Sequence, residues 1–325
     1  MTSEDGLFRR IFMVLSPRSI GYARLALRSL YCNCDEQFQI HLITDSEEDK
    51  LILGRELEQI TNNHSAEKSW TVHSASDLND QESDKFGRYQ NIRNFRLGHP
   101  CWRKITDPLL LSDNRDEMIV LDPDIYFPNR FRFEPTASAG VYLMWQKPSC
   151  LLPPEIVQAA IEARIPLAHH TDIGVAQWRL PIDLDWLDWL IGRLGSSQLP
   201  RNMHVESIIW AAMAMQLGGG YLDRKQWLCW HRSQYKRLLL KFGAKGVSVL
   251  SKEDFSVVKC FHAGGEAKRW LEEADRLGLL DSNECITSSV GFAPFVELKP
   301  SDYRSLQRGK KLLRGVGYYS IFGQS

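Results

Sequence analysis

Residues 118–124 (MIVLDPD) place two carboxylates directly after four apolar residues. The apolar run predicts a short, fully buried strand, and Asp122 and Asp124 flank Pro123 where that strand ends. In an open parallel sheet, ligands bind in the crevice beyond the carboxyl ends of the strands. Two carboxylates there form a hard-oxygen site that suits Mg²⁺ or Mn²⁺. The chemistry predicted for this segment is neutralisation of a diphosphate by a divalent cation.

A second acid-x-acid triplet, Asp183-Leu184-Asp185, has a structural explanation. It follows Pro181 and leads into an amphipathic stretch at residues 186–190 (WLDWL). Acidic residues near the start of a helix are favoured by the helix dipole. We therefore interpret Asp183 and Asp185 as helix-start residues.

Residues 257–270 (VVKCFHAGGEAKRW) form the second chemically interesting segment. A strand over 257–261 would present His262 at its end, and Gly265 would then let the backbone approach a ligand closely. An imidazole can bind a metal, and the amine of Lys268 can bind phosphate. Taken alone, His262 is more often a structural histidine, so the two segments must be considered together.

Together, the two segments resemble glycosyltransferase family 8, which includes retaining galactosyltransferases of bacterial lipopolysaccharide and glycogenin. The family motif HxxGxxKPW is matched by His262, Gly265, Lys268 and Trp270, with Arg269 in place of the proline. The 140 positions from Asp122 to His262 are also similar to the separation in that family. The resemblance implies the GT-A fold, an α/β Rossmann-like fold of nucleotide-diphospho-sugar transferases with a mainly parallel central sheet.

The resemblance also implies the roles of these residues. Asp122, Asp124 and His262 would bind Mn²⁺ or Mg²⁺, and Gly265 and Lys268 would contact the diphosphate of the donor. The donor implied is a UDP-sugar, and the acceptor a glycan, a lipid-linked molecule or a protein. The reaction implied is a same-face substitution in which the leaving phosphate helps to deprotonate the acceptor.

Three further positions match the family less specifically. Lys104 corresponds to an arginine that contacts the sugar or the phosphates. Asp172, in TDIGV, lies at the asparagine of an FNxGV segment that lines the donor sugar, and Glu206 falls near an Asp-Gln pair that begins an acceptor-side helix. Asp172 and Glu206 are therefore candidates for a carboxylate that stabilises positive charge near the anomeric carbon. Alternatively, Asp172 caps a turn after Thr171 and Glu206 is only an acid at a helix N-terminus.

The turn after the first expected strand, residues 16–19 (SPRS), departs from the family. Family members usually carry there an acidic or amide residue that reads the uracil, and often a tyrosine that stacks on it. We expect Ser16 in this turn and Tyr22 in the following helix to contact the nucleotide. The assignment of uridine as the base rests on the resemblance alone.

The elements that must position these residues begin as strand, helix, strand, helix. Apolar runs predict strands over 10–16 and 38–44, and helical spacing predicts helices over 22–32 and 47–60. This alternation implies right-handed crossovers and a mainly parallel sheet. Residues 61–100 are polar, and we expect loops with one short strand. Further along we expect helices over 102–111, 154–164 and 205–217, strands over 118–121, 174–178 and 257–261, and an element over 141–145.

Composition limits the class of protein. The 325 residues include 40 basic and 40 acidic ones, so no net field attracts nucleic acid, which we exclude as a partner. The longest apolar run, residues 208–215, is too short to span a bilayer. No basic and apolar leader opens the chain, and its seven cysteines contain no CxxC pair. We expect reduced thiols and a cytoplasmic location.

We divide the chain into a catalytic domain, residues 1–275, and a C-terminal extension, residues 276–325. The tail from residue 299 holds one acidic residue, Asp302, and these basic and aromatic or apolar ones: Lys299, Arg304, Arg308, Lys310, Lys311, Arg314, Tyr318, Tyr319, Ile321 and Phe322. Such a tail suits peripheral contact with an anionic membrane. The resemblance supports this, because lipopolysaccharide transferases often end in a similar tail. The alternative is a solvated tail that packs on its own domain or on a partner subunit.

Two other functions compete with glycosyl transfer. A nucleotidyltransferase that makes nucleotide-sugars has a similar sheet, but this chain has no glycine-rich phosphate loop after the first strand. A non-catalytic relative that binds a glycan or a partner would have no need to keep Asp122, Asp124, His262 and Lys268 together.

Overall fold

The computed structural model describes residues 8–62, 68–113, 116–136, 139–179, 181–231, 233–289 and 291–318. Its strands are β1 Arg9–Val14, β2 Phe38–Ile43, β3 Lys68–His73, β4 Glu117–Leu121, β5 Ile125–Tyr126, β6 Arg130–Phe131, β7 Val141–Trp145, β8 Thr171–Arg179, β9 Gly219–Tyr221, β10 Trp227–Cys229, β11 Cys260–His262, β12 Cys285–Ile286 and β13 Ala293–Pro294. Eight of them form one sheet, in the order β13-β9-β7-β8-β4-β1-β2-β3.

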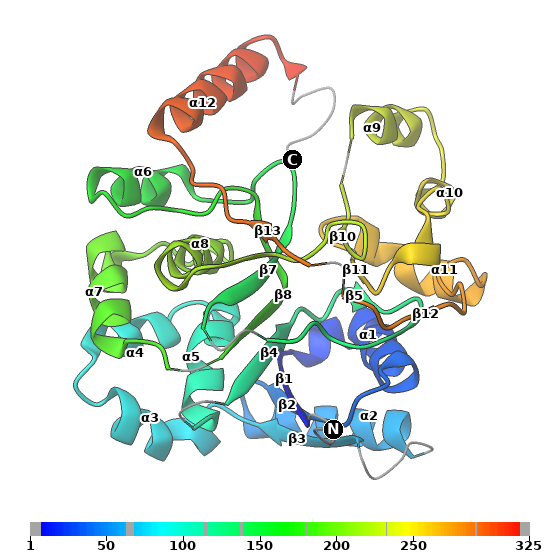
Figure 1. Cartoon of the computed structure of the whole chain (residues 1–325), viewed down its shortest axis with the longest axis horizontal. Helices are drawn as coiled ribbons and strands as arrows, with labels where there is room; N and C mark the ends of the chain where they lie inside the picture. Colours follow the sequence, from blue (N-terminus) through cyan, green and yellow to red (C-terminus); the bar gives the residue numbers. More distant parts are fainter. Residues whose placement is uncertain are drawn as a thin grey trace.

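The helices are α1 Ile20–Asn33, α2 Glu47–Thr61, α3 Asn79–Phe86, α4 Gln90–Arg96, α5 Arg103–Leu111, α6 Pro154–Glu162, α7 Leu184–Leu194, α8 Val205–Leu217, α9 Gln234–Lys241, α10 Gly246–Leu250, α11 Leu271–Arg276 and α12 Pro300–Gly315. They lie on both sides of the large sheet (Figure 1), with α1 and α2 on one face and α4, α5, α7 and α8 on the other. This is the predicted α/β architecture.

The central strands β1 and β4 are apolar in their middle, at residues 11–13 and 118–121, because both faces of the sheet are covered there. In β4, Met118 and Val120 pack into the core beneath α5 and α8, whereas Ile119 and Leu121 pack into the core beneath α1 and α2. Strands β4, β1, β2 and β3 pair in parallel, and β8 runs antiparallel to β4. The two cores therefore hold β4 firmly, and the chain leaves the sheet at Asp122.

The prediction of loops over residues 61–100 was wrong, although the single strand expected there is β3. The region also contains α3 and α4, which have only eight and seven residues. Helices this short carry too few apolar positions to show a period, and they are stabilised by packing of residues such as Phe86, Ile92 and Phe95 against the core. Most other predicted elements are confirmed within a few residues. The strand expected over 257–261 is present but shorter and shifted: it is β11, Cys260–His262, and a 3₁₀ turn, Phe255–Val257, precedes it.

A small second sheet, in the order β10-β11-β5, lies beyond the carboxyl end of β4. Strand β5 follows Asp124 directly and pairs antiparallel with β11, so that Ile125 lies opposite His262. Strand β10 pairs in parallel with β11 on the other side, so that Cys229 also lies opposite His262. This sheet brings segments that are far apart in the sequence to the end of β4.

The chain after residue 275 adds a strand to the large sheet, forms a separate two-stranded sheet with β6, and then forms α12. Strand β13 pairs with β9 at the edge of the large sheet, and β12 pairs with β6. The boundary that we place at residue 275 stays a prediction. Within the described residues, no helix combines the length and the apolar character needed to cross a membrane.

Candidate functional site

Asp122, Asp124 and His262 converge at the end of β4. The Nε2 atom of His262 lies 3.3 Å from Oδ1 of Asp124 and 3.7 Å from Oδ2 of Asp122. The backbone holds this arrangement, because the N–H of Asp122 donates to the carbonyl of Gly174 in β8 at 2.9 Å and the N–H of Ala263 donates to the carbonyl of Asp124 at 2.9 Å. The structure thus brings the three predicted ligands together.

The donor set fits a small divalent cation. Each of the three residues offers one ligand atom, and these atoms all lie within 4.8 Å of one another. Neighbouring ligand atoms of a bound Mg²⁺ lie about 3 Å apart, and Nε2 of His262 lies at similar distances, 3.3 and 3.7 Å, from the two carboxylates. Two carboxylate oxygens and one imidazole are donors that Mg²⁺ or Mn²⁺ accepts.

The electrostatics of these three residues also favour a cation. Burial raises the pKa of Asp122, Lys104 offsets part of that effect, and the nearby Asp124 adds to it. Burial opposes ionisation of Asp124 too, but His262 and Lys268 outweigh it and lower the pKa of Asp124 to about 2. Burial alone would lower the pKa of His262, yet Asp172 and Asp124 raise it well above its usual value. The carboxylates therefore hold the imidazole as a cation when no metal is bound.

Lys104 joins the metal-ligand group to Glu206. Its ammonium lies 2.5 Å from Oδ1 of Asp122 and donates to Oε1 of Glu206 at 2.7 Å, and all three side chains are largely buried. Burial raises the pKa of Glu206 to about 8, against the opposing effect of Lys104. Oε2 of Glu206 is buried and has no hydrogen-bond partner among the described residues. A buried polar atom without a partner is unusual and indicates a place where a ligand group can bind.

Lys268 lies beside the second oxygen of Asp124, the one that His262 does not approach most closely. Its Nζ is 3.5 Å from Oδ2 of Asp124, and it lies 5.3 Å from the centre of the Tyr22 ring. The Lys268 side chain is 32% exposed, so its amine is accessible to a ligand from solvent. Gly265 has a φ of +66°, which few other residues adopt, and the turn it makes places Lys268 beside the carboxylates.

Ser16 has a local role in the structure. Its Oγ accepts a hydrogen bond from the N–H of Arg18 and caps the 3₁₀ turn Pro17–Ser19. Its contact with a nucleotide stays a prediction. Asp183 likewise caps α7 by accepting from the N–H of Trp186, so the structural interpretation of that residue is confirmed.

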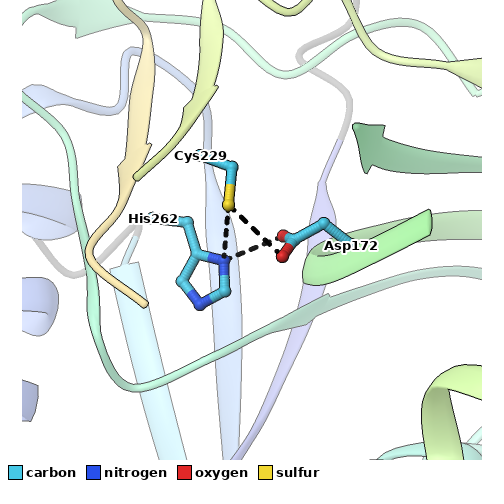
Figure 2. Close-up of side chains that lie close together, drawn as sticks. All are labelled: Asp172, Cys229 and His262. Carbon is cyan, nitrogen blue, oxygen red and sulfur yellow. Dashed lines mark hydrogen bonds and ion pairs between the residues drawn. The ribbon is translucent and has the colours of Figure 1, made fainter. Parts of the chain in front are cut away.

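Asp172, in β8, lies behind His262 (Figure 2). Its Oδ1 is 2.8 Å from Nδ1 of His262, and its Oδ2 is 3.4 Å from Sγ of Cys229. Oδ1 also accepts the N–H of Gly174 at 2.9 Å, which is the turn-capping contact expected of this residue. Asp172 therefore contacts the Nδ1 edge of the imidazole, whereas Nε2 lies toward Asp122 and Asp124.

Three residues around His262 and Asp172 were missed in the sequence. Cys229 lies in an apolar strand, where a lone cysteine gives no signal, and Gln146 follows β7 with no recognisable motif. Gly174 is part of the TDIGV segment, but its importance is steric. A Cβ atom at this position would lie 2.6 Å from the His262 ring, so only glycine leaves room for the imidazole.

Comparison with family models and with curated proteins finds no match. Among solved structures, mouse xyloside xylosyltransferase 1 in its apo form matches 80% of this chain and 99% of its own, with 13% sequence identity and a TM-score of 0.51. This chain has the GT-A glycosyltransferase fold. The galactosyltransferase LgtC in complex with donor and acceptor sugar analogues matches 91% of this chain and 99% of its own, with 12% identity and a TM-score of 0.47. At such identities the likeness establishes the fold, and the activity must be inferred from the side chains.

Because Gly174 packs closely against His262, adding a single methyl group at this position should destabilise the fold. We expect Gly174→Ala to lower the free energy of unfolding by about 1–3 kcal/mol, because the imidazole must move. Gly54→Ala, in the interior of α2 with no atom within 4 Å of the new Cβ, is the control and should be neutral or slightly stabilising. Urea unfolding of both variants measures this, and equal stabilities would contradict it.

The raised pKa of Glu206 predicts a pH dependence of stability. Between the ordinary pKa of 4.5 and about 8, the folded protein binds more protons at this site than the unfolded protein, so stability falls as the pH rises through this window. The Glu206→Gln variant lacks this titrating group, so its free energy of unfolding should fall less steeply with pH than that of the wild type. The two slopes should differ by up to about 1.4 kcal/mol per pH unit. Urea unfolding of metal-free protein at pH 5–8 measures the two slopes. Parallel curves would show that Glu206 is ionised throughout.

Proposed function

We propose that this protein is a metal-dependent, retaining glycosyltransferase that moves a sugar from a UDP-sugar to a glycan, lipid-linked or protein acceptor. The observation that carries the proposal is the convergence of Asp122, Asp124 and His262, with Lys268 alongside, at the carboxyl end of β4 in a GT-A fold. The GT-A fold alone would not distinguish an active transferase from an inactive relative. Four converging ligand residues favour the active enzyme.

Asp122, Asp124 and His262 would hold Mn²⁺ or Mg²⁺. When bound, such a cation supplies Lewis-acid neutralisation of the departing diphosphate. The neighbouring side chains would act on the substrate directly. Lys268, partly exposed beside Asp124, would pair with a phosphate oxygen and stabilise the charge that develops as the sugar leaves.

Glu206 is the better candidate for the carboxylate near the anomeric carbon. One of its oxygens pairs with Lys104, and the other has no partner among the described residues. Lys104 keeps this buried carboxyl close to Asp122 and offsets the cost of ionising it. In an oxocarbenium-like transition state, the free oxygen would face positive charge. Same-face transfer itself is proposed from the family resemblance.

A nucleotidyltransferase is less well supported. Its glycine-rich loop would follow the first strand, where this chain has Ser16 and a 3₁₀ turn, Pro17–Ser19, without glycine. No contact in the described residues favours this second function.

We predict that Asp122→Ala abolishes both sugar transfer and metal-dependent donor binding, because it removes one ligand and one of the two carboxylates that pair with Lys104. The measurement is the shift in melting temperature with UDP plus Mn²⁺ compared with UDP plus EDTA, since a ligand of the native state raises apparent stability. Wild type should shift only with Mn²⁺, and the variant should not shift.

Asp183→Ala is the matched control, because it also removes the first acid of an acid-x-acid triplet but affects only the cap of α7. It should keep the Mn²⁺-dependent shift. Near-normal donor hydrolysis by Asp122→Ala with Mn²⁺ would show that the metal assignment is wrong.

We also propose that α12 contacts an anionic membrane surface from the cytoplasmic side. Leu312 and Val316 are 72% and 75% exposed, among basic residues that include Arg308, Lys311 and Arg314. Tyr318 hydrogen-bonds Gln234 at the start of α9, a second helix with exposed apolar side chains. Exposed apolar residues among basic ones are typical of helices that lie in a membrane interface. Tyr319, Ile321 and Phe322 lie outside the described residues.

Full-length protein with Arg308, Lys311 and Arg314 changed to glutamate should pellet several-fold less than wild type with phosphatidylserine-containing liposomes in low salt, because each basic residue near such a surface contributes about 1 kcal/mol. The control carries the same charge change at exposed Arg55, Arg193 and Arg276, away from α12. Equal pelleting of the two triple variants would remove the membrane proposal.

A further inference from the structure

The carboxylate of Asp172 faces the back of His262 and not the open side of the site. We propose that Asp172 is a positioning residue: it holds the imidazole in the tautomer with the proton on Nδ1, so that the Nε2 lone pair points at the position between Asp122 and Asp124. This inference rests on the proposed function, because it takes His262 as a metal ligand.

The contacts of Asp172 are saturated. Oδ1 accepts from Nδ1 of His262 at 2.8 Å and from the N–H of Gly174 at 2.9 Å. Oδ2 accepts from Sγ of Cys229 at 3.4 Å, and from the amide nitrogen of Gln146 at 3.0 Å when that amide is turned so that its nitrogen faces Asp172. An ionised carboxylate has about four acceptor sites, and all four are in use here. Asp172 therefore has no free lone pair for a sugar, and this favours a positioning role over a direct role at the anomeric carbon.

Packing around the His262 ring leaves it little freedom to rotate. Gly174 packs against one side of it, and Cys229 lies opposite it in the neighbouring strand, with Sγ 3.9 Å from Nδ1. A carboxylate accepts hydrogen bonds and cannot donate one, so Nδ1 must carry the proton. Once the imidazole has lost its second proton to bind a metal, Nε2 is the ring nitrogen with the lone pair, and it faces Asp124 and Asp122.

A carboxylate behind a metal-bound histidine also makes the imidazole a stronger ligand, and loss of such a partner typically costs 10–100-fold in metal affinity. Asparagine would keep an acceptor for Nδ1–H but remove the negative charge, whereas alanine would remove both. The structure therefore predicts a graded series, in which Asp172→Asn weakens metal binding less than Asp172→Ala.

The test is the dissociation constant for Mn²⁺ alone, measured from the electron paramagnetic resonance signal of free Mn²⁺. We expect Asp172→Ala to weaken binding about 10–100-fold and Asp172→Asn by a smaller factor. The control is Asp188→Asn, because both oxygens of this carboxylate also accept hydrogen bonds: Oδ1 accepts the backbone N–H groups of Asn91 and Ile92 at the start of α4, and Oδ2 accepts the side-chain amide of Asn91. It should lose stability and keep wild-type Mn²⁺ affinity.

The His262→Ala variant distinguishes an error in the metal site from an error in the role of Asp172. If wild type and His262→Ala bind Mn²⁺ equally, or wild type does not bind it, the metal site itself is wrong. If His262→Ala weakens binding but folded Asp172→Ala and Asp172→Asn do not, the metal site stands and the role of Asp172 is overturned.

A second readout needs no variant. In ¹⁵N-labelled protein with Mg²⁺, the long-range nitrogen–proton spectrum of the His262 ring should show a proton on Nδ1 and none on Nε2. A proton on Nε2 in that state would overturn the proposal, whatever the affinities are.

Discussion

The short antiparallel pairing of β5 with β11 is the interaction on which the rest of this site depends. It sets Ile125 opposite His262, and so joins the end of β4 to a segment 140 positions later than Asp122. Two residues of strand pairing are weak by themselves. They are held because β10 extends the same small sheet and because the backbone of Asp124 bonds Ala263. Lys268 follows β11 and takes its position from this junction, whereas Lys104 in α5 and Asp172 in β8 are positioned by the large sheet and its helices.

Burial of so many charges at one point is costly, and the contacts show how the cost is limited. An unpaired buried charge destabilises a protein strongly, whereas a buried pair roughly offsets its own desolvation. Asp122 pairs with Lys104, Asp124 with Lys268, and Asp172 with His262. A set of apolar residues would give a more stable core at the same place. The charges are therefore best explained by the binding of a charged ligand, with rigidity supplied by the pairs among them.

Much of this could be predicted from the sequence because it depends on local pattern. The apolar residues before Asp122 and the motif around His262 identified the two halves of the site, and the first four elements followed from periodicity alone. The roles of Asp172 and Cys229 depend on the order of strands in two sheets, which no local pattern specifies. The helices α3 and α4 were missed because seven or eight residues carry too little period to separate a helix from a loop.

We propose that Asp122, Asp124 and Nε2 of His262 bind one divalent cation together with a nucleotide diphosphate. A crystal structure of the protein with Mn²⁺ and UDP, with data collected at the manganese absorption edge, tests it most directly. We predict one anomalous peak within bonding distance of all three side chains and of the UDP phosphates. A peak on the opposite side of the imidazole, between Cys229 and Asp172, or bound UDP without any peak at the end of β4, would contradict it.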